Sequence, residues 1–207
     1  MLPLPARHDD RDEPSGAVVL PVASAAPPDA ELVRRALAGD RWAESAIYQR
    51  HAPMVANLAG RLLARHADAL DVLQDVFVEA LAELGSLRDP AALRPWLLRR
   101  TVRRVGRVLR ARRWRRLVGL DRGSDDLTLE AMASPELSPE ARLELRRIGA
   151  LLASLPERQR TAWILHHVEG ETLPAVAEAC GVSLATAKRE IAAARVTLDV
   201  HVAKGNP

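Results

Sequence analysis

The stretch TLPAVAEACGVSLATAKREIAAAR, residues 172–195, decides how the second half of this chain folds. It predicts a short helix, a turn at Gly181 and a longer helix that Ser183 can cap. Glycine takes the left-handed conformation of such a turn at no steric cost. This order of elements is typical of a helix-turn-helix, whose second helix lies in the major groove of DNA.

The N-terminal half of that second helix is the part that would reach base edges. Lysine and arginine can address guanine, and threonine can contact a base or a phosphate. The residues that we predict to contact DNA here are Ala185, Thr186, Lys188, Arg189 and Ala192. The alternative interpretation is a helical hairpin that binds no ligand. Cys180 falls on the predicted packed face, where we interpret it as a small hydrophobic residue.

A second informative stretch, LRRTVRRVGRVLRARRWRR at 98–116, contains ten arginines among nineteen residues and no acid. A helical wheel places Leu98, Val102, Val105 and Leu109 on one side, where they can pack on a core. The arginines predicted to face outward are Arg99, Arg100, Arg103, Arg104, Arg107 and Arg110. Like charges at helical spacing cost about 0.2–0.5 kcal/mol per pair unless a polyanion neutralises them. We therefore predict contact with nucleic acid; the alternative is a solvated basic face.

The remaining segments from Asp29 onward also indicate helices. The predicted helices cover 30–38, a segment that follows Asp40, a segment that begins near Pro53, 69–84, a segment opened by Asp89 and Pro90, 140–153, 157–168, 173–180 and 184–203. The candidate N-caps are Asp29, Asp40, Asp68 and Ser138, and Gly39 is a candidate helix stop. No stretch alternates as a strand would.

Composition supports an all-α fold, because aromatic residues make up only 3% of the chain and hydrophobic residues 48%. Such a mixture suits helical bundles better than sheets. Residues 121–140 carry six acids and one base together with glycine, serine and proline, which indicates a linker. We predict a disordered leader at 1–28 and two small helical domains, 29–116 and 139–204. A flexible acidic linker at 117–138 joins them, and the second domain ends in the helix-turn-helix.

Several function classes lack the residues that they need. His166 and His167 are adjacent, so on a helix they point in different directions and do not converge on a metal ion. No nucleophile motif, phosphate loop or carboxylate pair indicates catalysis, and we expect no enzyme activity, metal, cofactor or small-molecule substrate. One cysteine cannot form an internal disulfide, and no apolar run reaches the roughly 18–20 residues that span a membrane. We expect a cytoplasmic protein.

Residues 68–112, DALDVLQDVFVEALAELGSLRDPAALRPWLLRRTVRRVGRVLRAR, and residues 152–195, LASLPERQRTAWILHHVEGETLPAVAEACGVSLATAKREIAAAR, carry two motifs in order. The first resembles the D-A-x-D-L-V-Q-[ED]-x-F pattern and following W-L of bacterial RNA polymerase sigma factors of the extracytoplasmic-function type, in the sigma-70 family. The second resembles their L-P-x-x-x-R segment and terminal helix-turn-helix. The resemblance covers most of 30–203. It implies an alternative sigma factor that binds core RNA polymerase and directs promoter recognition, −10 melting and transcription initiation.

The resemblance also implies roles for matching positions. Asp71, Gln74 and Asp75 would bind the clamp helices of the largest polymerase subunit. The helix that contains the arginines would bind the −10 element. Trp96 belongs to the same −10 region, where we interpret it as core support beneath the binding surface. The loop 85–92 would hold a flipped base of the −10 element. The predicted recognition helix would read the −35 element of promoter DNA. A partner anti-sigma factor is implied as well, and the acidic linker resembles the tether that passes through the polymerase.

Some positions depart from the family pattern. Arg103 stands where the family usually has asparagine, and Arg107 where aspartate is common. Leu70 replaces a residue that is commonly acidic, while Glu190 and Ala193 occupy positions that are often basic. The resemblance therefore does not extend to the promoter sequence. The rival hypothesis is a stand-alone helix-turn-helix regulator, in which the polymerase-facing acids and the acidic linker would have no role.

Overall fold

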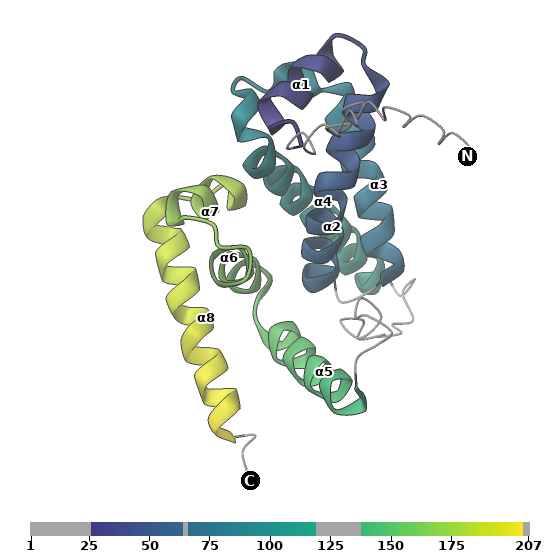
Figure 1. The fold of residues 1–207 in the computed structure, drawn as a ribbon. Helices are drawn as coiled ribbons and strands as arrows, with labels where there is room; N and C mark the ends of the chain where they lie inside the picture. Colours follow the sequence, from purple (N-terminus) through teal and green to yellow (C-terminus); the bar gives the residue numbers. More distant parts are fainter. Residues whose placement is uncertain (1–25, 64–65, 119–137, 205–207) are drawn as a thin grey trace, which may run out of the picture.

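The computed structural model describes residues 26–63, 66–118 and 138–204, which form α-helices and two short 3-10 helices (Figure 1). The elements are α1 (Asp29–Leu37), α2 (Arg41–Leu63), α3 (His66–Ala82), η1 (Leu84–Ser86), η2 (Pro90–Ala92), α4 (Leu93–Leu117), α5 (Pro139–Ser154), α6 (Glu157–His167), α7 (Leu173–Cys180) and α8 (Leu184–Lys204). The described residues contain no strand, and the all-α prediction with two helical domains is confirmed. The domain limits stay predictions, and most of the leader 1–28 and of the linker 117–138 lies outside the described residues.

The first domain is built on three long helices, α2, α3 and α4, which pack on one another, with α1 at one end (Figure 1). Its largest fully buried side chains include Leu32, Ile47, Leu58, Leu62, Leu93 and Leu97. Each such side chain contributes about 1.5–3 kcal/mol when it leaves water. The two leucines of α4 in this set anchor the arginine-rich helix in the core.

The helix α2 is continuous over 23 residues, so the predicted division near Pro53 is wrong. A proline inside a helix removes one backbone hydrogen bond and costs about 3 kcal/mol. Ile47 before the proline and Val55 and Leu58 after it are all buried in the same core. Because burial of this face on both sides offsets the lost hydrogen bond, the helix passes through the proline.

Two predicted N-caps and one predicted stop are confirmed. The Asp40 carboxylate accepts a hydrogen bond from the backbone N–H of Trp42 at 2.9 Å. Ser138 accepts one from the backbone N–H of Ala141 at 3.2 Å. Gly39 follows α1 with a φ of 86°, a conformation that glycine adopts without strain. These residues begin and end helices as their sequence positions predict.

The two other predicted N-caps, Asp29 and Asp68, lie inside the first turns of α1 and α3. The predicted capping role is wrong, because α1 has Pro28 at its N-cap and α3 begins at His66; both carboxylates pair instead with basic side chains from other helices. Arg50 of α2 reaches Asp29 at 2.7 Å, and Arg112 of α4 forms an ion pair with Asp68. Arg112 is buried and also donates to the carbonyl of Leu63 at 3.2 Å, which ties α4 to the end of α2.

The second domain contains α5 to α8, whose bounds agree with the predicted helices within one residue. In this domain α6, α7 and α8 pack on one another, and α5 contacts α8. Ile164, Leu165, Val176, Ala187 and Ala194 form its buried centre. The two alanines of α8 leave room for α6 and α7 to approach it closely.

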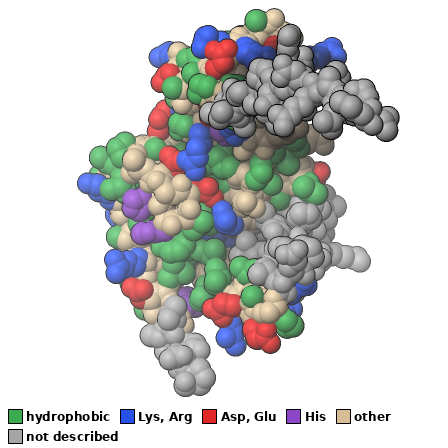
Figure 2. Space-filling view, in the orientation of Figure 1, with side chains coloured by type: hydrophobic (Ala, Val, Ile, Leu, Met, Phe, Trp, Pro, Cys, Tyr) green, Lys and Arg blue, Asp and Glu red, His purple; other side chains and the backbone are tan. Residues whose placement is uncertain are grey.

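The two domains are in contact, because α7 packs against α4 and α6 against α2 (Figure 1). Figure 2 shows Lys or Arg side chains beside Asp or Glu side chains near the middle of this face. The surface that carries α4 is therefore covered in part by the second domain.

Candidate nucleic-acid interface

The helix α4 presents its apolar side to the core, as its sequence predicts. Leu98 and Val105 are buried, and Val102 and Leu109 are half-buried. The apolar stripe fixes the rotation of the helix about its own axis. That rotation in turn decides which arginines reach neighbouring helices and which do not.

Three arginines of α4 pair with a row of acids on α3 and at the residue that follows its end, Glu83. Arg100 reaches Glu83 at 2.6 Å, and Arg107 reaches Glu79 at 3.2 Å. Arg104 pairs with Asp75 one turn earlier on the same row. The hydrogen bond from Arg100 lowers the pKa of the Glu83 carboxyl. The arginine run has no acid of its own, but Asp75 and Glu79 of α3 and Glu83 directly after α3 supply acids to these three residues.

Arg99, Arg103 and Arg110 have different surroundings. Arg99 pairs with Glu178 of α7, and its pKa is lowered by burial and by the neighbouring charges of Arg103 and Arg100. Among the residues that the structure describes, no carboxylate lies at ion-pair distance from Arg103 or Arg110. Both side chains are exposed. We call Arg103 and Arg110 the unpaired arginines.

Trp96 exposes only 8% of its surface, and its ring packs under the guanidinium of Arg100 at 4.0 Å. A buried ring covered by an arginine has no open face on which a base could stack. The observed position agrees with the interpretation of Trp96 as core support.

The residues predicted to bind polymerase lie on α3. Asp71 and Gln74 are exposed, whereas Asp75 is half-buried by its contact with Arg104. Val72 and Val76 on the opposite side of the helix are buried. The structure therefore separates an exposed acidic edge of α3 from the acids that face α4.

The helix-turn-helix has the predicted local geometry. Gly181 ends α7 with a φ of 66° and a ψ of 38°, the left-handed region. Ser183 accepts a hydrogen bond from the backbone N–H of Thr186 at 3.1 Å and begins α8. Thr172 caps α7 through Ala175 at 3.4 Å, which the sequence prediction did not include.

The predicted recognition residues lie near the start of α8. Ala185, Lys188, Arg189 and Ala192 are exposed, and Thr186 is half-buried. Thr186 accepts a hydrogen bond from Arg189 at 3.4 Å. Ala187 and Ile191 point into the domain. The helix can thus present the five predicted residues to a ligand while its other side holds the domain together.

Cys180 is half-buried at the end of α7. Burial, together with the charge of Glu190, raises the pKa of the Cys180 thiol to about 11. A thiol with so high a pKa is a poor nucleophile at neutral pH. Its position agrees with the interpretation as a small packing residue.

A cleft of about 450 Å³ lies between α4 and the helix-turn-helix. Arg103, Arg107 and Arg110 line it from the first domain, while Glu178 and Glu190 are among the residues that line it from the second. The arginines face outward from the first domain, as predicted, and in this arrangement the second domain stands opposite them across the cleft.

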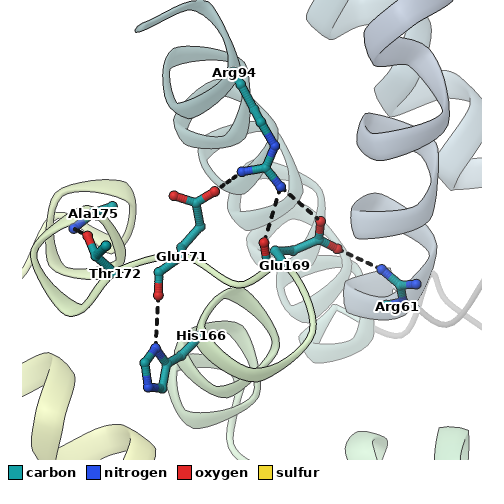
Figure 3. Close-up of polar contacts among 7 residues, drawn as sticks. All are labelled: Arg61, Arg94, His166, Glu169, Glu171, Thr172 and Ala175. Atoms are coloured by element: carbon teal, nitrogen blue, oxygen red, sulfur yellow. Dashed lines mark hydrogen bonds and ion pairs between the residues drawn. The ribbon is translucent and has the colours of Figure 1, made fainter.

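Sequence reasoning missed a polar network that joins the domains through the segment between α6 and α7 (Figure 3). Arg61 and Arg94 come from the first domain, and Glu169 and Glu171 from the second. No sequence signal predicts these pairs, because the residues lie 77 and 108 positions apart along the chain. Only the placement of Glu169 and Glu171 on both sides of Gly170 marks the segment as a charged turn.

Comparison with known proteins identifies the family. Residues 47–115 match the family model Sigma-70 region 2, and residues 145–198 match Sigma-70, region 4. The RNA polymerase sigma factor NccH of Alcaligenes xylosoxydans xylosoxydans is 31% identical over 171 residues, which cover 82% of this chain and 92% of NccH. The chain belongs to the sigma-70 family.

Further likenesses place this sigma factor more closely. The extracytoplasmic-function sigma factor SigM of Mycobacterium tuberculosis is 32% identical over 171 residues, 82% of each chain. The structure of CnrH in complex with the cytosolic domain of CnrY matches with a TM-score of 0.65 at 24% identity, over 86% of this chain and 99% of CnrH. The protein is an alternative sigma factor of the extracytoplasmic-function type, and sigma factors are transcription initiation factors.

Two further properties concern the residues that the structure describes. None of the helices in that part of the chain combines the length and apolarity that crossing a bilayer requires. No group of three or more His, Cys, Asp and Glu residues there could hold a metal ion.

Proposed function

We propose that this sigma factor divides its work between the two predicted domains. The first, 29–116, binds core RNA polymerase and opens the −10 element, and the second, 139–204, reads the −35 element. One observation carries the proposal: the chain has two basic surfaces, one on each domain. The first is the arginine-rich helix α4, and the second is the start of the capped helix α8. Phosphate contacts from such surfaces provide affinity, and base contacts provide specificity.

In the first domain, the exposed edge of α3 meets basic side chains of the polymerase through Asp71 and Gln74, with Asp75 beside them. On α4, the unpaired arginines Arg103 and Arg110 bind phosphates of the −10 strand directly. Arg99, Arg100, Arg104 and Arg107 take part after they exchange a carboxylate for a phosphate. Trp96 supports this surface from below.

In the second domain, Lys188 and Arg189 contact guanine edges or phosphates of the −35 element, with Thr186 beside them and Ala185 and Ala192 in apolar contact with the groove. The chain performs no covalent chemistry and needs no metal, cofactor or small-molecule substrate. It acts in the cytoplasm without inserting into a membrane, and an anti-sigma factor holds it inactive. CnrH, whose structure was solved with part of CnrY, offers a precedent for a protein partner.

Polymerase binding tests the first half of the proposal. The double variant Asp71→Arg with Gln74→Ala should weaken association of the chain with core polymerase at least ten-fold, because a repulsive charge enters the exposed edge of α3. Asp199→Arg on α8 is the matched control, since Asp199 is exposed and, among the described residues, pairs with Arg195 of its own helix at 3.8 Å. Equal affinity of wild type and double variant for core polymerase would overturn the assignment of this edge.

A further inference from the structure

The segment between α6 and α7 carries two glutamates that are buried against the other domain. The side chain of Glu169 is 8% exposed and that of Glu171 is 12% exposed, although both belong to a surface turn of the second domain. Buried carboxylates remain charged only where they have charged or hydrogen-bonding partners. The partners here come from the first domain (Figure 3).

Two arginines from different helices of the first domain reach these carboxylates. Arg61 of α2 donates to Oε1 of Glu169 at 2.6 Å. Arg94 of α4 pairs with Glu171 and also donates to the backbone carbonyl of Glu169 at 3.2 Å. Charge-assisted hydrogen bonds of this kind are about twice as strong as neutral ones. Arginines from two helices of the first domain therefore bind the turn.

Hydrogen bonds within the second domain fix the conformation of the turn that presents the glutamates. The backbone N–H groups of Glu169 and Glu171 donate to carbonyls of α6 at 3.0 and 2.9 Å. Gly170 between them has a φ of 72°, which permits the sharp reversal. Nδ1 of His166 lies 2.8 Å from the carbonyl oxygen of Glu171. Both carboxylates therefore point away from their own domain.

The rest of the domain interface combines apolar contacts of α4 with α7, exposed ion pairs and an open cleft. Arg99 pairs with Glu178, and Arg113 approaches Glu157 at 3.7 Å. The cleft of about 450 Å³ remains open between α4 and the helix-turn-helix. Domains of one chain move relative to each other unless their interface is large and hydrophobic. In this interface the contacts of Glu169 and Glu171 are the most buried ion pairs.

We propose that Glu169 and Glu171, with Arg61 and Arg94, form an ionic latch that closes the second domain over α4 in the unbound chain. The latch has two discrete states, because rigid domains that turn about an interface either make these pairs or expose them to water. In the closed state the acids of the second domain occupy Arg94 and Arg99 as phosphates would. Nucleic acid and the second domain then compete for one face of α4.

In the closed state the distance between α4 and α8 is too short for the chain to contact both promoter elements. This conclusion rests on the proposed function. Glu178 contacts Arg99 of α4, and Lys188 lies ten residues after Glu178. Because ten residues span at most about 36 Å, Lys188 lies within about that distance of the contact. The −10 and −35 elements are about 25 base pairs apart, or about 85 Å at about 3.4 Å per base pair. Even with the lengths of the side chains added, α4 and α8 cannot reach both elements at once. The latch must open before both contacts form.

Distance measurements on the full chain test the latch without DNA or polymerase. Spin labels on Val78→Cys of α3 and Val196→Cys of α8, in a Cys180→Ser background, sit on side chains that are each 64% exposed. Double electron–electron resonance should give one narrow distance for the otherwise wild-type chain. Glu169→Gln with Glu171→Gln should broaden the distribution toward longer distances and multiply the open population about ten-fold, a coupling of ordinary size.

The control removes the same charge without touching the latch. Glu144→Gln with Asp199→Asn breaks two exposed ion pairs that lie within single helices of the second domain. This variant should keep the narrow distance. Glu169→Arg alone should open the chain, and Arg61→Glu combined with Glu169→Arg should close it again by restoring the pair in reverse. A broad distribution in the wild type, or one unchanged in the latch variants, overturns the latch.

A second measurement keeps the latch distinct from the proposed function. A fluorescent single-stranded −10 oligonucleotide should bind the Glu169→Gln and Glu171→Gln double variant about ten-fold more tightly than it binds the wild type or the control. An opened chain whose affinity for the oligonucleotide is unchanged overturns the competition on α4, although the distances still establish the latch. Oligonucleotide binding with unchanged distances supports the proposed function and overturns the latch.

Discussion

Removing the unpaired arginines should flatten the salt dependence of −10 strand binding more than removing two paired ones. Arg103→Ala with Arg110→Ala takes away two exposed guanidiniums that have no carboxylate partner among the described residues. Arg100→Ala with Arg104→Ala takes away two that are held by Glu83 and Asp75. An arginine that must release an acid before it binds a phosphate gains less from the exchange.

The magnitude follows from counterion release. Each phosphate neutralised on a single strand contributes about 0.7 to the slope of log K against log salt concentration. Loss of Arg103 and Arg110 should therefore reduce the slope by about 1.4. The ratio of wild-type affinity to variant affinity should then change by about 25-fold over a ten-fold range of salt concentration. The variant of Arg100 and Arg104 should reduce the slope by less than half of that.

Fluorescence anisotropy of a labelled −10 oligonucleotide, titrated with each full-length variant at several salt concentrations, measures these slopes. Circular dichroism melts serve as the control, because Arg100 covers Trp96 and its loss should lower the melting temperature, whereas the exposed Arg103 and Arg110 should not. Equal slopes for the two double variants would refute the distinction between paired and unpaired arginines.

Three further predictions concern the second domain. Lys188→Ala with Arg189→Ala should weaken binding of the holoenzyme to −35 duplex DNA by about 1–3 kcal/mol per lost base contact, measured by gel shift, and a change confined to −10 DNA would contradict it. Gly170→Ala should lower the free energy of unfolding by about 1–2 kcal/mol in urea titrations, since its φ of 72° strains any other residue, and an unchanged value would be inconsistent with the turn. Cys180 should react slowly with iodoacetamide at pH 8 and faster as the pH rises toward about 11, where burial places its pKa; rapid labelling at pH 8 would show a more open α7.

The helices and caps of the second domain could be predicted from sequence because local signals determine them. Gly181 must take a left-handed conformation, and Ser183 stands where the N-terminal N–H groups of α8 need an acceptor. The same local reasoning failed at Pro53, where burial on both sides of the proline keeps α2 continuous. It also failed at Asp29 and Asp68, which look like caps but pair with distant arginines.

The candidate site could be predicted only as far as each helix determines it. The wheel for α4 placed its apolar and basic sides correctly, but it could not show that acids on α3 and directly after it pair with Arg100, Arg104 and Arg107. Contacts between residues far apart in the chain depend on how helices pack. For the same reason the sequence does not predict that Glu169 and Glu171 pair with Arg61 and Arg94.

Transcription in a purified system tests the central claim most directly. Core RNA polymerase from the bacterium that carries this chain is combined with the full-length protein on a library of random promoter fragments, and the 5′ ends of the transcripts are sequenced. The account predicts transcripts that appear only with the added chain and begin downstream of a shared two-part motif. A set of start sites identical to that of core polymerase alone would contradict it.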